Sequence, residues 1–368
     1  MHDKVCTPMV RRKLCLVIPS LQAGGMERVM SELATYLYGH DDLEIHLVLY
    51  GKRPEIFYQI PDGIRVHKPL SGFNNRYRFY YSVSRLVFLR KAVARINPDS
   101  VLSFGEYWNS FVLLALFGLS CPVYISDRCS PASEPHGIHK ILRRWLYPGA
   151  KGVIAQTALA RKMYKEQFRH ENISVIGNPI RFPEQTSVSR QKRVLTIGRL
   201  IRSKNHDEII RMFCRIDKPG WNLVIVGGDA LKQGNEEILR GIVKSLDAES
   251  KVELAGYRKN TDNYYYESSL FVLASESEGF PNVIGEAMAA GLPVVAFDCI
   301  AGPSEMITDG VNGFLVPVGD YDQMASRIEL LMDDDDLRST MGSRAREAIE
   351  RFRLDVIGNE YYNFLLGA

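Results

Sequence analysis

The chain of 368 residues is 46% apolar and 24% charged, which is ordinary for a soluble globular protein and excludes long disordered stretches. Its length exceeds what one compact core usually takes, so two domains are expected. The net charge of +3 is uneven, because residues 1–177 hold 24 Lys and Arg against 14 Asp and Glu, and residues 178–368 hold 22 against 29. The first half should therefore face something anionic, such as nucleic acid, a membrane surface or a phosphorylated substrate.

The first half of the chain alternates short apolar strands with helices. Residues 14–19 are predicted to form a buried parallel strand, which leads through a Gly-Gly pair to a helix over 26–38. Further strands are predicted at 45–50, 100–104, 123–126 and 152–155, with helices around 111–119 and 138–147. This order predicts a Rossmann-like, doubly wound parallel sheet.

The second half repeats the pattern after a polar linker over residues 183–192. Its predicted strands are 193–197, 222–226, 251–254, 270–274 and 294–297, with helices between them. Two such α/β domains are expected to face each other across a cleft at the carboxyl ends of their strands. We place the domains at 1–177 and 178–350, and expect a C-terminal helix over 351–368 to pack back toward the first domain.

Nothing in the composition indicates export or a membrane span. The longest apolar run, residues 111–119, is too short to cross a bilayer, and residues 1–13 lack the apolar core of a signal peptide. The cysteines are scattered, with no pair at metal-ligand or redox spacing: Cys6, Cys15, Cys121, Cys129, Cys214 and Cys299. We expect reduced thiols in the cytoplasm, several of them acting as small core residues, and no metal site.

The segment 275–296 carries the strongest functional signal. Glu278 and Glu286 have seven residues between them and flank the start of a short predicted helix, for which Asn282 is the expected N-cap. The unpaired N–H groups of a first helical turn attract an anion, and carboxylates accept hydrogen bonds from sugar hydroxyls, so a nucleotide-sugar suits this segment. The alternative is that both glutamates are solvated helix-end charges.

Two further loops at predicted strand ends could contact phosphate. Gly24 and Gly25 let the backbone approach a ligand at a helix start, although a plain tight turn is the alternative; the absence of GxGxxG disfavours a dehydrogenase. Arg199 and Lys204 follow the predicted strand 193–197 and could neutralise a diphosphate leaving group, unless they form a solvated basic loop.

Basic and aromatic side chains alternate on the first half. Residues 73–95 interleave aromatics with arginines such as Arg76 and Arg78. A second patch contains Lys140, Arg143, Arg144 and Trp145. Such surfaces suit an anionic membrane and a lipid diphosphate acceptor. A nucleic-acid face is one alternative, disfavoured because no nucleic-acid module motif is present, and core aromatics with solvated arginines are another.

Taken together, these motifs resemble those of the GT4-type retaining glycosyltransferases, which have the GT-B fold. The resemblance covers nearly the whole chain. Its motifs are residues 24–29 (GGMERV), 177–179 (GNP), 198–200 (GRL) with Lys204, the Glu278-x7-Glu286 segment and 309–316 (DGVNGFLV). The last is similar to the family's hairpin after the donor site. The resemblance implies that domain 1–177 binds an acceptor and domain 178–350 a nucleotide-sugar.

The resemblance also implies roles for individual residues. Arg199 and Lys204 would hold the donor diphosphate, which Gly25 would approach from the other domain. Glu286 would accept hydrogen bonds from the ribose, and Glu278 would orient the transferred sugar. The other implied donor contacts are Gly24, the base neighbours Tyr257 and Arg258, and the backbone of Gly279, Phe280, Asn282 and Val283.

The chemistry implied by the resemblance retains the anomeric configuration and uses neither a metal nor a cofactor, because the leaving phosphate oxygen takes the acceptor proton. A His or Asp of the first domain often lies near the reaction centre in the family, and His136 and Asp127 are the candidates here. The expected acceptor or membrane contacts are Arg28, Arg76, Arg78, Arg128, Arg143 and Arg144.

The turn at residues 24–29 is similar to that of bacterial enzymes that extend polyprenyl-diphosphate-linked saccharides. We therefore expect a cytoplasmic enzyme, peripherally attached to the inner face of the plasma membrane. It would move a hexose or N-acetylhexosamine from a UDP-sugar to a lipid-linked or surface-polysaccharide acceptor. One alternative is a nucleotide-sugar epimerase on the same fold, which would need acid/base groups in the cleft. The other is a catalytically degenerate subunit, which would not need the four charged donor residues.

Overall fold

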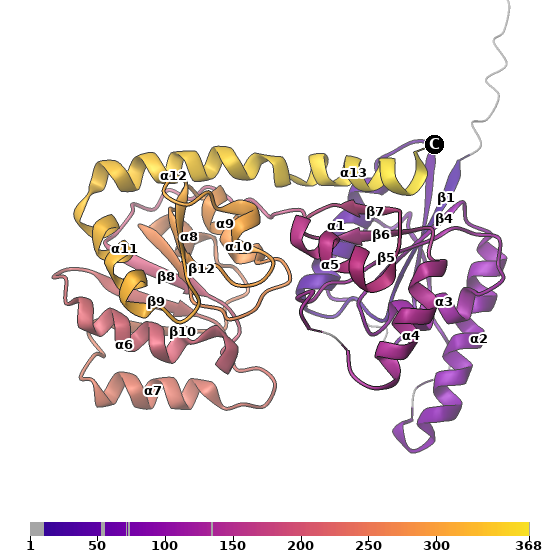
Figure 1. Cartoon of the computed structure of the whole chain (residues 1–368), viewed down its shortest axis with the longest axis horizontal. Helices are drawn as coiled ribbons and strands as arrows, with labels where there is room; N and C mark the ends of the chain where they lie inside the picture. Colours follow the sequence, from indigo (N-terminus) through magenta and orange to yellow (C-terminus); the bar gives the residue numbers. More distant parts are fainter. Residues whose placement is uncertain (1–10, 53–55, 71, 73, 134, 368) are drawn as a thin grey trace, which may run out of the picture. The chain divides into compact units, whose positions relative to one another are not determined.

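The computed structural model describes residues 11–52, 56–70, 72, 74–133 and 135–367. The chain divides into two compact units, which are residues 1–179 with 354–368 (the first unit) and residues 180–353 (the second unit) (Figure 1). Each unit is built on one parallel sheet with helices packed against it. This architecture confirms the predicted fold class of two Rossmann-like α/β domains.

The described part of the first unit contains seven parallel strands in the order β3-β2-β1-β4-β5-β6-β7. The strands are β1 (Arg12–Ile18), β2 (Leu43–Leu49), β3 (Arg65–His67), β4 (Ser100–Phe104), β5 (Val123–Ser126), β6 (Gly152–Ala155) and β7 (Ile173–Val175). In β1, Leu14 lies opposite Ile45 of β2 and Ser100 of β4. The central strands are buried on both faces, which explains why they are mostly apolar. Because all strands run the same way, the loops after β1, β4 and β5 emerge at one edge of the sheet.

Among the described residues of the first unit, six helices pack around this sheet. They are α1 (Gly25–Tyr38), α2 (Arg78–Ile96), α3 (Asn109–Leu116), α4 (Ile138–Leu146), α5 (Ala158–Phe168) and α13 (Leu354–Leu366), with 3₁₀ turns η1 (Asn75–Tyr77) and η2 (Tyr147–Gly149). Helix α13 packs on α1, where Gly358 lies so close to Tyr36 that a Cβ would come within 2.2 Å of its ring. Tyr361 of α13 is fully buried near Phe104. Helix α13 is therefore part of the core of the first unit.

The second unit contains six parallel strands in the order β10-β9-β8-β11-β12-β13. They are β8 (Arg193–Ile197), β9 (Asn222–Val226), β10 (Val252–Gly256), β11 (Leu270–Leu273), β12 (Val294–Phe297) and β13 (Gly313–Val316). The helices are α6 (His206–Ile216), α7 (Asn235–Ser245), α8 (Asp262–Glu267), α9 (Asn282–Ala289), α10 (Pro303–Met306), α11 (Tyr321–Asp333) and α12 (Asp335–Ile349), with 3₁₀ turns η3 (Arg202–Lys204) and η4 (Glu350–Phe352). Helices α6 and α7 pack together on one side of the sheet, and α9 packs with α12 on the other (Figure 1).

The segment 309–316 does not form the hairpin that the resemblance implied. Strand β13 pairs parallel with β12, from Gly313 opposite Val294 to Val316 opposite Phe297. A tight turn precedes it, in which the Gly310 N–H donates to the Gly313 carbonyl at 2.9 Å. The strand is parallel because the chain returns through a crossover that contains α10, and so enters β13 from the same end of the sheet as β12.

Two cysteines act as small core residues, as the sequence predicts. Cys15 in β1 and Cys299 after β12 are buried. Within the described residues, Cys121 and Cys214 are also free thiols, whereas Cys6 lies outside them. Burial raises the pKa of the Cys299 thiol to about 12, and the nearby Glu278 carboxylate adds to the shift. Cys299 is therefore a neutral packing residue.

Candidate functional site

The loops that follow β8 and β11 bring two of the predicted site residues into contact. These strands are neighbours in the sheet, so Lys204 of η3 and Glu278 emerge at the same edge. The Lys204 ammonium donates to a Glu278 carboxylate oxygen, and the two side chains are only 15% and 13% exposed. The backbone joins the loops as well, since the Glu276 N–H donates to the Ser203 carbonyl at 3.2 Å. A cation and an anion are thus held together where ligands of such sheets bind.

Glu286, on α9, is held by two residues that the sequence did not single out. The Tyr265 hydroxyl, which is buried, donates to Glu286 Oε2 at 3.0 Å. Arg181 Nη2 donates to the same oxygen at 3.5 Å, and its other amino group pairs with Asp262. Within the described residues, Oε1 of Glu286 has no hydrogen-bond partner, so this oxygen can accept from a ligand.

The start of α9 differs from the prediction in its cap. Pro281 is the N-cap and Asn282 is the first helical residue, so the expectation that Asn282 caps the helix was wrong. Pro281 has no side-chain donor or acceptor, and no side chain caps the helix. The first turn therefore leaves backbone N–H groups, including that of Val283, for an anion. Phe280 contributes only its backbone here, because its ring is buried against that of Phe352, with the two ring centres 5.5 Å apart.

Glycine is required at one point beside this turn. Gly302, after β12, has φ +151°, and a Cβ there would lie 2.5 Å from Pro281 Cδ and 3.5 Å from Glu278 Cβ. The loop after β12 can therefore pass close to the loop that carries Glu278 only without a side chain at this position. A Gly302→Ala change would move the Glu278 loop.

The remaining predicted donor residues of the second unit lie along the same sheet edge. Arg199 follows β8, is exposed, and has no ion-pair partner among the residues that the structure describes. Tyr257 and Arg258 follow β10; Tyr257 is exposed, and Arg258 donates to the Tyr264 hydroxyl at 3.1 Å. The Leu200 N–H donates to the Gly228 carbonyl at 3.0 Å, which ties the loops after β8 and β9 together.

In the first unit, the glycine turn opens α1 without a side-chain cap. Gly24 is the N-cap, and its N–H and carbonyl both hydrogen bond to the Tyr58 hydroxyl, at 3.0 and 2.9 Å. A Cβ at Gly24 would lie 2.2 Å from the Glu27 carboxylate. Burial raises the pKa of Glu27. The Glu27 carboxylate therefore lies at the first turn of α1, which begins at Gly25, whereas Arg28 pairs with Glu32 at 2.7 Å.

The two candidates for the reaction centre have different environments. His136 is exposed on the loop before α4. Asp127 is buried after β5, where it pairs with Arg143 and accepts hydrogen bonds from Tyr147 at 2.7 Å and Asn109 at 2.9 Å. Burial raises the pKa of Asp127 in spite of these partners. Asp127 is therefore tied into the core of the first unit.

Arg143 was predicted to belong to a basic surface, and this expectation was wrong. Its position on α4 turns it inward, where its side chain is 7% exposed and its guanidinium lies over the rings of Tyr147 and Phe168. Arg128 is also partly covered, since its guanidinium lies 3.7 Å from the centre of the Phe104 ring and donates to the Tyr361 hydroxyl.

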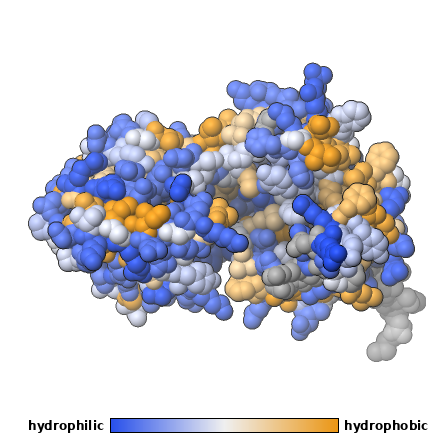
Figure 2. Space-filling view, turned by 90° about the horizontal axis from the view of Figure 1, so that it is seen from below, coloured by the Kyte–Doolittle hydropathy of each residue, from blue (hydrophilic) through white to orange (hydrophobic). Residues whose placement is uncertain are grey.

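Other members of the predicted acceptor surface are exposed. They include Arg76, Arg78 and Arg144, with the apolar side chains Phe79, Tyr80, Phe117, Ile141 and Trp145 on α2, α4 and the end of α3. Apolar side chains reach the surface between hydrophilic ones in the space-filling view (Figure 2). Among the described residues, no helix is long and apolar enough to span a bilayer, and no group of His, Cys, Asp or Glu side chains could hold a metal ion.

Comparison with known proteins identifies the family of this chain. Two family models match consecutive parts of the chain, "Glycosyltransferase Family 4" over residues 23–182 and "Glycosyl transferases group 1" over residues 179–348. The chain belongs to the GT4-type glycosyltransferases of the GT-B fold. It is thus a glycosyltransferase, and the loops after β8, β10 and β11 belong to the part that the group 1 model matches.

Relatives match this glycosyltransferase along almost its whole length. An alpha-1,4-N-acetyl-D-galactosaminyltransferase of Campylobacter jejuni, named for a diNAcBac-PP-undecaprenol glycan, is 27% identical over 96% of this chain and 98% of its own. The amylovoran biosynthesis glycosyltransferase AmsD of Erwinia amylovora is 28% identical over 90% and 93%. Among solved structures, Anabaena HepE in complex with UDP and glucose has a TM-score of 0.78 and 21% identity, covering 96% of this chain and 99% of that one.

Proposed function

We propose that this glycosyltransferase moves a hexose or an N-acetylhexosamine from a UDP-sugar to a lipid-linked or surface-polysaccharide acceptor, with retention and without a metal. The observation that carries the proposal is the arrangement at one edge of the second sheet. Lys204 and Glu278 are paired there, and Glu286 keeps one carboxylate oxygen for a ligand. A nucleotide-sugar presents a diphosphate and two sets of hydroxyls, which need such cations and acceptors.

We expect cationic groups to hold the diphosphate of the donor and carboxylates to hold its two sugars. Arg199 and Lys204 would neutralise the diphosphate, aided by the uncapped N–H groups of α9. Glu286 Oε1 would accept from the ribose, and the base would lie by Tyr257. Glu278 would orient the transferred sugar. HepE, whose structure contains UDP and glucose, has this fold and supports the UDP assignment.

The pairing of Glu278 supports a mechanism without an enzyme nucleophile. A carboxylate that accepts a hydrogen bond from Lys204 is a weakened nucleophile, since the cation stabilises its charge. The departing phosphate oxygen can instead take the proton of the acceptor hydroxyl, while the new glycosidic bond forms on the same face of the sugar. Lys204 and Arg199 then stabilise the negative charge that develops on the diphosphate.

The acceptor is proposed from the surface of the first unit and from the relatives. Exposed aromatic and basic side chains on α2 and α4, such as Phe79, Trp145 and Arg144, suit an anionic membrane surface on the cytoplasmic side. The Campylobacter relative is named for an undecaprenol-linked glycan, which supports a lipid diphosphate acceptor.

A donor screen tests the proposal. Protein with EDTA would be incubated with UDP-, GDP- and ADP-sugars, following nucleotide release and thermal stabilisation. We expect one UDP-sugar to stabilise the protein and to be slowly hydrolysed. Glu286→Gln should weaken its binding by about tenfold, whereas Glu347→Gln, on the exposed face of α12, should not.

Two outcomes of the same screen would contradict the proposal. Conversion of a UDP-sugar to its isomer without an acceptor would identify an epimerase. If no donor binds, the degenerate subunit is the better description. The membrane contact is tested by sedimentation with anionic vesicles at low salt, which Arg144→Glu should weaken and Arg346→Glu in the second unit should not.

A further inference from the structure

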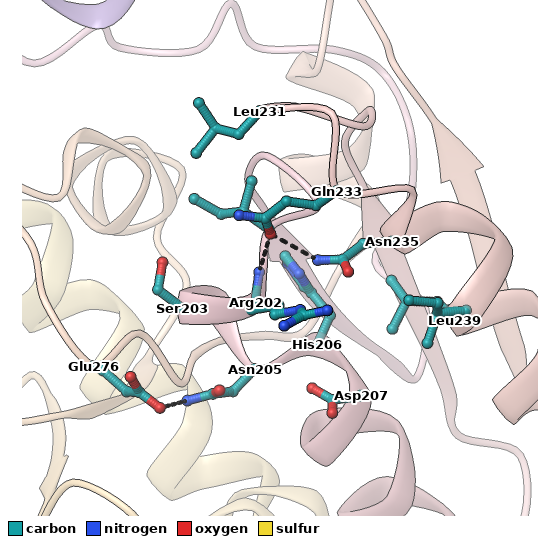
Figure 3. A pocket seen from close by; sticks show the side chains of 12 residues that line it. Arg202, Ser203, Asn205, His206, Asp207, Leu231, Gln233, Asn235, Leu239 and Glu276 are labelled. Carbon is teal, nitrogen blue, oxygen red and sulfur yellow. Dashed lines mark hydrogen bonds between the residues drawn. The ribbon is translucent and has the colours of Figure 1, made fainter.

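The second unit contains a hollow beside the donor loops, on the side of the sheet that α6 and α7 cover. Its volume is about 520 Å³, within the range of small-molecule sites. It is lined by twelve residues from the loops after β8, β9 and β11 and from the first turns of α6 and α7 (Figure 3). None of Lys204, Glu278 and Glu286 lines it. The hollow is therefore a different place from the donor site.

His206, the first residue of α6, lines this hollow without a protein partner. The residue is 4% exposed, and its side chain has no hydrogen bond to any residue that the structure describes. Burial lowers the pKa of His206 to about 4, so its ring is neutral at physiological pH and offers one donor and one acceptor. The ring nitrogens keep some access to the hollow, where they can form hydrogen bonds with a polar ligand.

The amide side chains around His206 are held in place by the protein. Gln233 Oε1 accepts from the Arg202 backbone N–H at 2.9 Å and from Asn235 Nδ2 at 3.5 Å (Figure 3). This leaves the amino group of Gln233 and the carbonyl oxygen of Asn235 for a ligand. Asn205 donates to Glu276 Oε1 at 3.2 Å, which leaves the other oxygen of that carboxylate. Donors and acceptors thus alternate around the hollow.

The rim of the hollow is formed by an unusual stretch of backbone. Leu231 and Lys232 both have left-handed φ values, of +57° and +56°. Bulky residues seldom adopt this strained conformation, which is typical of functional loops. The Leu231 side chain is exposed at the rim (Figure 3). The loop after β9 is therefore shaped around the hollow at an energetic cost.

We propose that this hollow binds a neutral, hydroxyl-rich sugar unit of a glycan, at a subsite separate from the donor. Eight of its twelve lining side chains are polar, which disfavours a lipid chain, and none is a phenylalanine, tyrosine or tryptophan, so a nucleobase would find no large ring to stack on. One guanidinium, Arg202, faces two carboxylates, Asp207 and Glu276, so phosphate is disfavoured. Sugar hydroxyls both donate and accept, which fits the alternation of groups.

Ligand-observed NMR on the full chain tests this inference. The probes are the methyl glycosides of glucose, galactose and their N-acetylated amino forms, with inorganic phosphate as the anionic probe, each with and without UDP. We expect one glycoside to bind in the millimolar range in the presence of UDP. Gln233→Met, which keeps the shape but loses the amide, should weaken its binding fivefold to tenfold. Gln323→Met, on exposed α11, should leave it unchanged.

Three outcomes would overturn the inference. These are binding of no glycoside, preferential binding of phosphate, or glycoside binding that survives both Gln233→Met and a second variant, Asn235→Leu. Glycoside binding that UDP abolishes would place the sugar in the donor site and would also overturn it. The donor assignment is tested separately, because Glu286 does not line this hollow and Glu286→Gln acts on UDP binding.

Discussion

The Lys204–Glu278 pair makes a quantitative prediction about the stability of the second unit. Both side chains are largely buried, 15% and 13% exposed, and each neutralises the other. Removing one partner of a buried pair costs about 3–5 kcal/mol, because the remaining charge is left uncompensated. Since both side chains keep some access to water, we expect Lys204→Met to lower the free energy of unfolding by about 3 kcal/mol. For a unit of this size, the melting temperature should fall by roughly 6–12 °C.

Urea and thermal unfolding of four proteins measure the effect, namely wild type, Lys204→Met, Glu278→Gln and the double variant. The double variant should be more stable than the sum of the single losses predicts, with a coupling of about 1–3 kcal/mol. The matched control is Lys251→Met, which breaks a pair with Asp217 on the exposed surface of the same unit and should change stability far less. Additive losses, or a Lys204→Met variant as stable as the control, would refute the reasoning.

The same variants separate stability from donor binding. Glu278→Gln frees Lys204 from its anionic partner, so UDP should bind more tightly to this variant while transfer becomes slower. Lys204→Met should weaken UDP binding and slow transfer. If both variants weakened UDP binding equally, Lys204 would be a structural partner of Glu278 and would not contact the diphosphate.

Three further predictions concern other described contacts. Tyr265→Phe removes the hydrogen bond that fixes Glu286 and should weaken UDP binding about threefold to tenfold in a titration, with little loss of helicity. Asp127→Asn leaves the buried Arg143 without its anion and should destabilise the first unit by about 3 kcal/mol in urea unfolding; near-normal stability would show that water reaches this pair. Burial holds the pKa of His206 near 4, below its unfolded value. Acidification from pH 6.5 to 4 should therefore lower the free energy of unfolding by roughly 3 kcal/mol, and a His206→Gln variant should lose this pH dependence.

Local patterns in the sequence were enough to place the site on one sheet edge. Strands read as apolar runs, and the residues that follow them, Lys204 and Glu278, must emerge at the edge where parallel strands end. The pairing between them was not predictable, because it joins residues 74 positions apart and depends on side-chain directions. The hydrogen bond from Arg181 to Glu286 joins residues 105 positions apart and was not predictable for the same reason.

Predictions from the sequence were wrong where the local preference of a residue conflicted with its surroundings in the fold. Arg143 was assigned to the surface because arginine usually remains there, but its turn of α4 faces inward and Asp127 compensates its charge. Asn282 was assigned as a cap because asparagine favours that position, but the chain enters α9 at Pro281. The hairpin assigned to 309–316 followed a resemblance, and the crossover through α10 gives a parallel strand instead.

The place of α13 has a consequence for how the chain folds during synthesis. The first unit needs α13, because Tyr361 fills its core and Gly358 fits against Tyr36, yet residues 180–353 are made before this helix. The second unit is continuous and can fold as soon as it leaves the ribosome, whereas the first waits with an uncovered α1 until its last helix arrives. The N-terminal half of the chain is thus the later one to reach its native state, and a nascent chain halted before α13 would present apolar surface to chaperones.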